Sequence, residues 1–274
     1  MSRYTELINR VLATYEQFPV DILGLGDQAG ELTYLKNLAE SYARTTEDID
    51  LCLASTQQGG SILEIGSYLG VVSRSLKELG YDVHACDHPI YHKSASLRAM
   101  YERSDIPFEA VDLSKTGLPF NNEQFDAVII CEVIEHLNFN PLPIIRQINR
   151  VLKKDGVLYI GMPNHASLQN RLRLLGGRSI HNPVSDLLLQ LDTRANMSVG
   201  LHWREYTAAE TRGMVESMGF TVTRVSHVLP SQYLRTGWIK RLAKQLIYSV
   251  QTLRPFQVVV SKKRELPEFE YWRG

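Results

Sequence analysis

The chain of 274 residues has the composition of a globular protein, with 44% hydrophobic residues, 22% charged residues and a formal net charge of zero. This length is consistent with one main domain that carries additions. The neutral charge balance argues against a nucleic-acid partner, because such partners are attracted by strongly basic proteins. The sequence has no run of about 18 apolar residues, so we expect no membrane-spanning helix.

The amino terminus lacks the apolar segment of a secretion signal, and we therefore expect a cytoplasmic protein. The three cysteines do not have the spacing of a metal site. Two of them, Cys86 and Cys131, lie at the ends of predicted core strands, where cysteine usually behaves as a small hydrophobic residue. We expect no disulfide framework.

Residues 1–58 show apolar positions at helical spacing in three segments, 4–15, 32–42 and 48–53, and a loop over 19–30 separates the first two. The pattern predicts a helical amino-terminal region. Two interpretations of it stay open, a cap over a ligand site and a brace on the edge of a sheet.

A strand, a glycine turn and a helix follow each other over residues 61–79. The apolar strand contains Glu64 and ends at Gly66, and the helical pattern begins after Gly70. Glycine has no Cβ and adopts positive φ, so a ligand can approach the backbone closely there, while the helix presents free N–H groups. A tight turn that binds no ligand is the alternative interpretation.

Three further strands are predicted over residues 81–87, 108–113 and 125–131. Asp87 ends the first of them about 20 residues after the glycine turn, a spacing at which a carboxylate can accept both hydroxyls of a ribose. Asp112 lies at the end of the second strand. Helix caps or loop acids are the alternative roles for these two residues.

A predicted helix over residues 141–152 and a fifth strand over 156–160 complete this pattern. The ordered set from residue 61 to residue 164 resembles the class I S-adenosylmethionine-dependent methyltransferases. The resemblance implies an α/β fold, a Rossmann-like, seven-stranded, doubly wound sheet with an antiparallel last strand and helices on both faces.

The resemblance rests on the motif Glu64-x-Gly66-x-x-x-Gly70 together with Asp87 and Asp112. It implies that Glu64 helps to hold the cationic methionine end of the cofactor, Asp87 the ribose and Asp112 the adenine amino group. The cofactor-binding residues that it implies are Glu64, Gly66, Ser67, Tyr68, Gly70, Asp87, Asp112, Leu113, Cys131 and Glu132.

Glu132, Glu135 and His136 follow the fourth predicted strand. If the chain becomes helical there, positions i, i+3 and i+4 share one face, so two carboxylates and an imidazole converge. The carboxyl ends of parallel strands are where open α/β sheets bind ligands. Because two buried carboxylates need a cation or a proton to offset them, a metal is a plausible partner of this cluster.

Together with His202, the cluster resembles the metal site of small-RNA 2′-O-methyltransferases and of ubiquinone-pathway O-methyltransferases. The resemblance implies a divalent cation on Glu132, Glu135, His136 and His202, which positions a hydroxyl and lowers its pKa. Mixed oxygen and nitrogen ligands leave Mg, Mn and Zn open. In the alternative without a metal, His136 is the catalytic base or orients the acceptor, with Glu132 and Glu135 as supporting or capping residues.

Residues 165–206 form a predicted insertion that would roof the site and determine acceptor specificity. Its arginines, Arg171, Arg173 and Arg178, would bind a phosphate or another anion. A solvated basic face of a surface helix is the alternative.

The remaining residues, 207–274, contain a helix over 207–218 that begins with a capping box, and the sixth and seventh strands, over 220–225 and 256–261. Residues 237–253 between these strands form an amphipathic helix. Its basic face and its tryptophan are typical of a helix at the surface of anionic lipid. Packing on the sheet or on a second copy of the chain is the alternative.

We therefore divide the chain into a helical amino-terminal cap (1–58), a cofactor-binding core (59–164), an active-site insertion (165–206) and a carboxy-terminal part of the methyltransferase fold (207–274). The oligomeric state is left open by the sequence. The partners that we expect are a small-molecule or glycan acceptor and, through residues 237–253, the inner face of the membrane.

The predicted function is an S-adenosylmethionine-dependent O-methyltransferase. The layout after residue 164 is similar to that of bacterial methyltransferases of cell-envelope glycans, which implies a sugar hydroxyl of a glycan or lipid-linked glycan as the acceptor. A quinone or phenol O-methyltransferase is the alternative within enzymes. A cofactor-binding or assembly module without turnover is an alternative of another class, because fold does not fix function.

Overall fold

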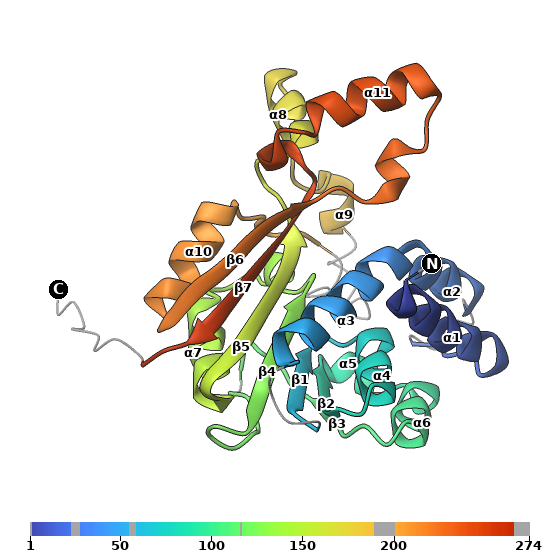
Figure 1. The fold of residues 1–274 in the computed structure, drawn as a ribbon, viewed down its shortest axis with the longest axis vertical. Helices are drawn as coiled ribbons and strands as arrows, with labels where there is room; N and C mark the ends of the chain where they lie inside the picture. Colours follow the sequence, from blue (N-terminus) through green and yellow to red (C-terminus); the bar gives the residue numbers. More distant parts are fainter. Residues whose placement is uncertain (1, 23–27, 55–58, 116, 189–200, 266–274) are drawn as a thin grey trace. The chain divides into compact units, whose positions relative to one another are not determined.

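A computed structural model describes residues 2–22, 28–54, 59–115, 117–188 and 201–265 of the protein (Figure 1). The strands of this part form one seven-stranded sheet in the order β3-β2-β1-β4-β5-β7-β6. β1 pairs with β2 and β2 with β3 in parallel, whereas β6 and β7 pair antiparallel. The structure thus confirms the predicted α/β fold and its antiparallel last strand.

The strands are β1 (Ser61–Ile65), β2 (Asp82–Asp87), β3 (Phe108–Ala110), β4 (Phe125–Cys131), β5 (Leu152–Pro163), β6 (Phe220–Val228) and β7 (Phe256–Lys263). The α-helices are α1 (Arg3–Gln17), α2 (Gln28–Asn37), α3 (Ala39–Leu53), α4 (Val71–Glu78), α5 (Pro89–His92), α6 (Ala95–Arg103), α7 (Leu142–Val151), α8 (Leu168–Leu175), α9 (Val184–Leu188), α10 (Ala208–Ser217) and α11 (Trp238–Ile247). Short 3₁₀ helices are η1 (Ile134–His136), η3 (Ser231–Leu234) and η4 (Gln251–Leu253).

The chain divides into two compact units. Unit 1 comprises Met1–Ile129 and Val151–Val157, and unit 2 comprises Ile130–Arg150 and Leu158–Gly274. The domain boundaries expected from the sequence, at residues 59, 165 and 207, stay a prediction. Residues 23–27 of the predicted loop and residues 189–200 of the predicted insertion lie outside the described residues.

Unit 1 contains parallel strands with completely buried apolar positions. Ile62 and Leu63 of β1, and Val83 and Ala85 of β2, are completely buried, as expected for a parallel strand that is covered on both faces. The helix predicted after the glycine turn is α4, and it packs on β2, α1 and α3. These contacts hold the turn between β1 and α4 in a fixed position.

The predicted helix over residues 32–42 is wrong in one respect, because the structure has two helices there. α2 ends at Asn37 and α3 begins at Ala39, with Leu38 outside the helical conformation between them. Leu35 and Ala43 on either side of the break are both buried. The apolar spacing therefore continues across the break and did not reveal it.

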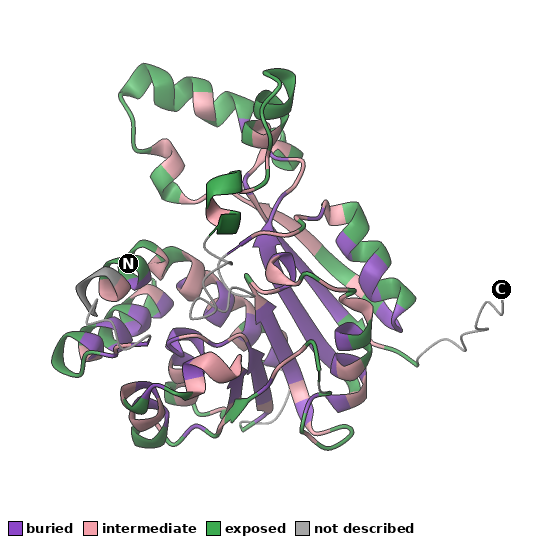
Figure 2. Ribbon diagram, turned by 180° about the vertical axis from the view of Figure 1, so that it is seen from behind, coloured by how far each residue is buried: buried purple, intermediate pink, exposed green. Residues whose placement is uncertain are grey.

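Unit 2 contains the antiparallel pair β6 and β7, on which α10 packs. The predicted capping box at the start of α10 is confirmed, because Glu210 N donates to Thr207 Oγ1 (3.2 Å) and Thr207 N donates to Glu210 Oε2 (2.8 Å). Gly219, with a φ of 80°, follows the helix. Figure 2 shows the strands largely buried and helices α8 and α11 largely exposed. No helix of the described residues is long and apolar enough to cross a membrane.

Candidate functional site

The turn between β1 and α4 adopts a backbone that favours glycine. Gly66, Tyr68 and Gly70 have positive φ values of 73°, 48° and 67°. A Cβ at Gly70 would lie 2.9 Å from Tyr101 Oη, so a larger residue would displace the tyrosine. Gly66 N donates to Cys86 O (2.8 Å), which fixes the turn against the end of β2.

Glu64 is a buried carboxylate that faces the first turn of α4. Its Oε2 accepts from Ser73 N (2.9 Å) and from Ser73 Oγ, so the acid satisfies a free N–H group of the helix. Burial raises the pKa of Glu64 to about 7, even though the hydrogen bonds from Ser73 act in the opposite direction. A cation beside this carboxylate would favour its ionised form.

Asp87 ends β2, and its two carboxylate oxygens accept from neighbouring backbone N–H groups. Tyr68 N donates to Oδ2 (2.6 Å) and His88 N donates to Oδ1 (2.7 Å). Burial raises the pKa of Asp87 to about 6, against the effect of these two bonds. The carboxylate thus lies directly beside the glycine turn, as the sequence predicts.

Asp112 follows the short strand β3 and lies in a more exposed place, next to the half-buried Leu113. Its side chain accepts from Ser114 Oγ (2.6 Å) and pairs with Lys115 Nζ (2.9 Å). The hydrogen bond from Ser114, with that from Lys115, lowers the pKa of Asp112 to about 2. This acid is therefore ionised at neutral pH.

Tyrosine side chains gather around Tyr68 of the glycine turn, and sequence reasoning, which named Tyr68, missed the others. The Tyr68 ring makes edge-to-face contacts with Tyr34 (5.9 Å between centroids) and with Tyr91 (5.7 Å). Tyr15 Oη donates to the carbonyl of Leu69. Tyr15, Tyr34 and Tyr91 lie outside the motif, so only the fold reveals that α1 and α2 reach the turn.

Glu132 follows β4 in unit 2 and has a positive φ of 53°. Glu132 N donates to Gly161 O (2.8 Å), which continues the pairing at the end of β5, and a Cβ at Gly161 would lie 3.0 Å from Cys131 Sγ. The chain then forms η1, a single 3₁₀ turn that contains Glu135 and His136. The α-helical face expected for these residues is wrong, because Glu132 lies before the turn in a left-handed conformation.

Glu135 and His136 nevertheless converge with the distant His202. One potential ligand atom from each of the three residues lies within 4.8 Å of the other two. Glu135 is completely buried, and neither of its carboxylate oxygens has a hydrogen-bond partner in the described part of the chain. Burial, together with the nearby charge of Glu132, raises the pKa of Glu135 well above its usual range.

The Nδ1 atoms of the two histidines both face oxygen atoms. His136 Nδ1 lies 3.0 Å from Leu201 O, and His202 Nδ1 lies 3.1 Å from Glu205 Oε1. Because both partners only accept, each Nδ1 carries the proton, and Nε2 of a neutral ring keeps its lone pair. Burial, with the neighbouring His202, lowers the pKa of His136, which favours the neutral ring.

Glu205 and Asn170 support this cluster and were missed from the sequence. Asn170 Nδ2 donates to Glu205 Oε2 (2.8 Å), while the other carboxylate oxygen faces His202. Burial opposes ionisation of Glu205, but the hydrogen bonds from His202 and Asn170 outweigh it and lower its pKa. The spacing of Glu205 three residues after His202 was the available sequence signal. Asn170, on α8, gave none.

A family model described as a methyltransferase domain matches residues 34–225. The chain belongs to this methyltransferase family. The match includes the glycine turn, Asp87, the cluster of Glu135 and His136, and His202. It confirms the family of S-adenosylmethionine-dependent methyltransferases that the sequence motifs resemble.

Curated relatives of this methyltransferase are similar over part of their length. It is 28% identical over 130 residues to a ubiquinone biosynthesis O-methyltransferase of Glaesserella parasuis, covering 44% of this chain and 53% of the relative. It is 28% identical over 148 residues to a demethylmenaquinone methyltransferase of Renibacterium salmoninarum, covering 50% and 60%. The chain thus spans about half the length of the curated relatives that it matches.

Solved structures share the fold of the methyltransferase at low sequence identity. A magnesium protoporphyrin IX methyltransferase from Synechocystis with bound SAH has a TM-score of 0.54 and 14% identity, over 84% of this chain and 87% of that one. An S-adenosylmethionine-dependent methyltransferase from Mesorhizobium loti has a TM-score of 0.52 and 18% identity, over 80% and 98%. These similarities support the fold alone.

Proposed function

We propose that the protein transfers a methyl group from S-adenosylmethionine to an oxygen atom of its acceptor. The observation that carries the proposal is the cluster of Glu135, His136 and His202 in a chain of the methyltransferase family. A buried carboxylate without a partner, next to two imidazoles, suits the handling of a hydroxyl proton, directly or through a metal.

Most of the residues that would hold the cofactor belong to unit 1, and Cys131 and Glu132 belong to unit 2. Glu64 would bind the methionine end, Asp87 the ribose and Asp112 the adenine amino group. The geometry at Asp87 supports its part, because its oxygens lie at the glycine turn, and each oxygen has a second lone pair beyond its bond to the backbone. Ser67, Tyr68, Leu113, Cys131 and Glu132 stay predicted cofactor contacts.

S-adenosylmethionine supplies a methyl group that is already activated by the sulfonium. The protein has to align the acceptor hydroxyl with that group and remove its proton. His136 is the proposed base, because its fixed Nδ1 proton leaves Nε2 as the acceptor and its lowered pKa keeps the ring neutral. The products are S-adenosylhomocysteine, the methyl ether and the protonated imidazole.

The cluster also fits a divalent cation, in which case His136 would be a metal ligand and not the base. A cation would be held by His136, His202 and Glu135, whose carboxylate has no hydrogen-bond partner among the described residues, and the carboxylate of Glu205 would orient His202. Mg, Mn and Zn are compatible with such ligands. When bound, the cation would lower the pKa of the acceptor hydroxyl. Glu132, which is not one of the three residues that converge, stays a predicted fourth ligand.

We propose a sugar hydroxyl of a glycan or lipid-linked glycan as the acceptor. The arginine-rich segment from Arg171 to Arg178 in the predicted insertion supports a polar, anionic acceptor. The names of the curated relatives favour a second candidate, a quinone or phenol hydroxyl. Peripheral membrane contact through residues 237–253 would suit either acceptor, because both can be carried by a lipid.

The experiment that tests the proposal measures cofactor and metal in one preparation. The protein is purified without chelator, S-adenosylmethionine is titrated by calorimetry, and bound metal is measured by elemental analysis. We expect cofactor binding by the wild type and by His136→Ala, and stoichiometric metal in the wild type alone. Lys154→Ala, at an exposed position, is the control.

Each outcome separates the candidate functions. Binding of the cofactor without metal would leave His136 as a base that acts alone. Methylation assays with vicinal diols of sugars and with phenols then decide the acceptor class. A protein that binds S-adenosylmethionine but methylates neither class of acceptor would indicate a binding module without turnover. A protein that does not bind the cofactor would contradict the proposed methyl transfer.

A further inference from the structure

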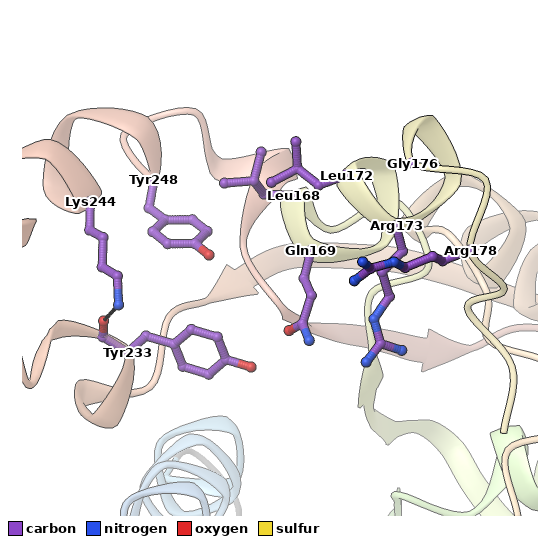
Figure 3. Close-up of a pocket in the computed structure, with 9 residues that line it drawn as sticks. All are labelled: Leu168, Gln169, Leu172, Arg173, Gly176, Arg178, Tyr233, Lys244 and Tyr248. Atoms are coloured by element: carbon purple, nitrogen blue, oxygen red, sulfur yellow. Dashed lines mark hydrogen bonds between the residues drawn. The ribbon is translucent and has the colours of Figure 1, made fainter. Parts of the chain in front are cut away.

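Helices α8 and α11 of unit 2 line a pocket with a volume of about 470 Å³ (Figure 3). Its lining contains three cationic side chains, Arg173, Arg178 and Lys244, and no carboxylate. Figure 3 shows the two arginines on one side of the pocket and Lys244, Tyr233 and Tyr248 on the other. Such a lining suits an anion that also has an apolar part.

Backbone carbonyls accept hydrogen bonds on both sides of the pocket. Lys244 Nζ donates to Tyr233 O (2.8 Å), which fixes the ammonium and leaves two further N–H groups for a ligand. Arg178 N donates to Arg173 O (2.8 Å), so the backbone brings these two residues next to each other at the end of α8. Guanidinium groups match phosphate oxygens in a bidentate manner.

Helix α11 is amphipathic, and its apolar face is exposed to the surroundings and not packed on the core. Its apolar side chains are exposed, with Trp238 72%, Leu242 58% and Leu246 75% accessible. Lys244, on the basic face, is half-buried and faces the pocket. Lys244 of α11 therefore reaches the pocket, while the apolar face of the helix is exposed.

The end of α8 shows the same combination. Leu172 lines the pocket and is 58% exposed, and Leu175 is 84% exposed. Apolar and cationic side chains are thus presented together by two helices that are distant in the sequence. A membrane surface that carries phosphate groups is complementary to both kinds of side chain.

We propose that the pocket between α8 and α11 binds the phosphate group of an anionic membrane lipid while the apolar side chains of both helices enter the bilayer surface. The phosphate site goes beyond the proposed methyl transfer and rests on the membrane contact proposed above. A second copy of the chain is a poorer occupant, because a symmetric contact would bring the two basic pockets together. Nucleic acid would leave the exposed leucines and Trp238 without a partner.

The experiment is sedimentation of the full chain with vesicles of phosphatidylcholine, with and without phosphatidic acid. We expect binding to the phosphatidic-acid vesicles. The double variant Arg173→Gln/Arg178→Gln should weaken it about tenfold or more, since each basic residue at such a surface contributes substantially. The matched control is Lys240→Gln/Arg241→Gln, which removes the same charge from α11 at residues that do not line the pocket.

A second arm measures the pocket without a membrane. Glycerol 3-phosphate is titrated into the same proteins and into Leu242→Ser/Leu246→Ser, and binding is followed by NMR. The leucine variant should lose vesicle binding but still bind glycerol 3-phosphate. Equal losses of vesicle binding in both charge variants would contradict the pocket as the phosphate site, but would still support contact with the membrane. Phosphate binding without vesicle binding would overturn the lipid as its source. Titration of S-adenosylmethionine into every variant tests its folding and, separately, the cofactor site.

Discussion

The glycine turn of unit 1 and the histidine cluster of unit 2 differ in whether their carboxylates are hydrogen-bonded. Asp87 accepts two backbone N–H groups, and Glu64 accepts the N–H and hydroxyl of Ser73. Glu135 is more deeply buried than either, yet neither of its oxygens has a hydrogen-bond partner in the described residues. An unpaired buried carboxylate is costly, so it takes up a proton or binds a cation.

The two sites therefore differ in whether their carboxylates need a ligand to be satisfied. The turn is complete without the cofactor, because the backbone supplies the hydrogen bonds that keep its acids in place. The cluster is incomplete, and its two histidines are fixed by Leu201 and Glu205 in the tautomer that a metal or a proton requires. Changes in the turn should therefore act on cofactor affinity, and changes in the cluster on metal affinity.

The largest effect is expected for Asp87→Ala. The change removes the carboxylate proposed to bind both ribose hydroxyls and leaves the N–H groups of Tyr68 and His88 without their acceptor. Hydrogen bonds to a charged group contribute about 1.5–3 kcal/mol each, so we expect at least roughly a hundredfold loss of affinity for S-adenosylmethionine. Calorimetric titration measures it.

Asp82→Ala is the matched control, because Asp82 lies at the exposed start of the same strand. It should keep the wild-type affinity. Bound metal should be equal in both variants if the two regions are independent. An Asp87→Ala protein that is folded and binds the cofactor as tightly as Asp82→Ala would contradict the proposed role.

A smaller effect is expected for Glu205→Gln. Glu205 is a positioning residue, since it orients His202 and would not itself bind the metal. Loss of such a supporting carboxylate typically lowers metal affinity roughly 10- to 100-fold. Competition with a chelating dye measures the change, and the affinity for S-adenosylmethionine should stay the same.

Glu216→Gln provides the comparison for this variant, because Glu216 is exposed and pairs only loosely with Arg212 (3.4 Å). A change of metal affinity in Glu205→Gln, but not in Glu216→Gln, would support separate roles for the glycine turn and the histidine cluster. Parallel losses of metal and cofactor affinity would instead indicate a general disturbance of the fold.

The strands around the turn could be predicted from the sequence because their signals are local. The predicted strand and helix at the turn match β1 and α4, and the fourth strand matches β4 over the same residues. Thr207 and Glu210 form the predicted capping box because both partners are only three residues apart. The break at Leu38 escaped prediction, since buried apolar residues on both sides preserve the helical period.

The cluster could be predicted only in part, because its geometry depends on contacts across the fold. Glu135, His136 and His202 converge as the sequence pattern suggests, but on a 3₁₀ turn and not on an α-helix. The left-handed backbone of Glu132 has no sequence signal, since glutamate rarely adopts it. The contacts made by Asn170 likewise depend on tertiary structure, and its role could not be read from a local motif.

The smallest effect concerns the pH dependence of cofactor binding at Glu64. Burial raises the pKa of this acid to about 7, so below that pH the free protein holds a proton on Glu64. The protonated acid contributes to folding stability below its unfolded pKa, and this contribution is lost as the pH rises toward 7. The cationic methionine end requires the ionised acid, so its binding should release a proton and tighten about tenfold between roughly pH 6 and 8. Calorimetry in buffers of different ionisation enthalpy measures both quantities. Glu64→Gln keeps an acceptor for Ser73 and should remove most of this pH dependence, whereas an unchanged slope in the variant would assign the proton to another group, with Asp87 the first to be tested.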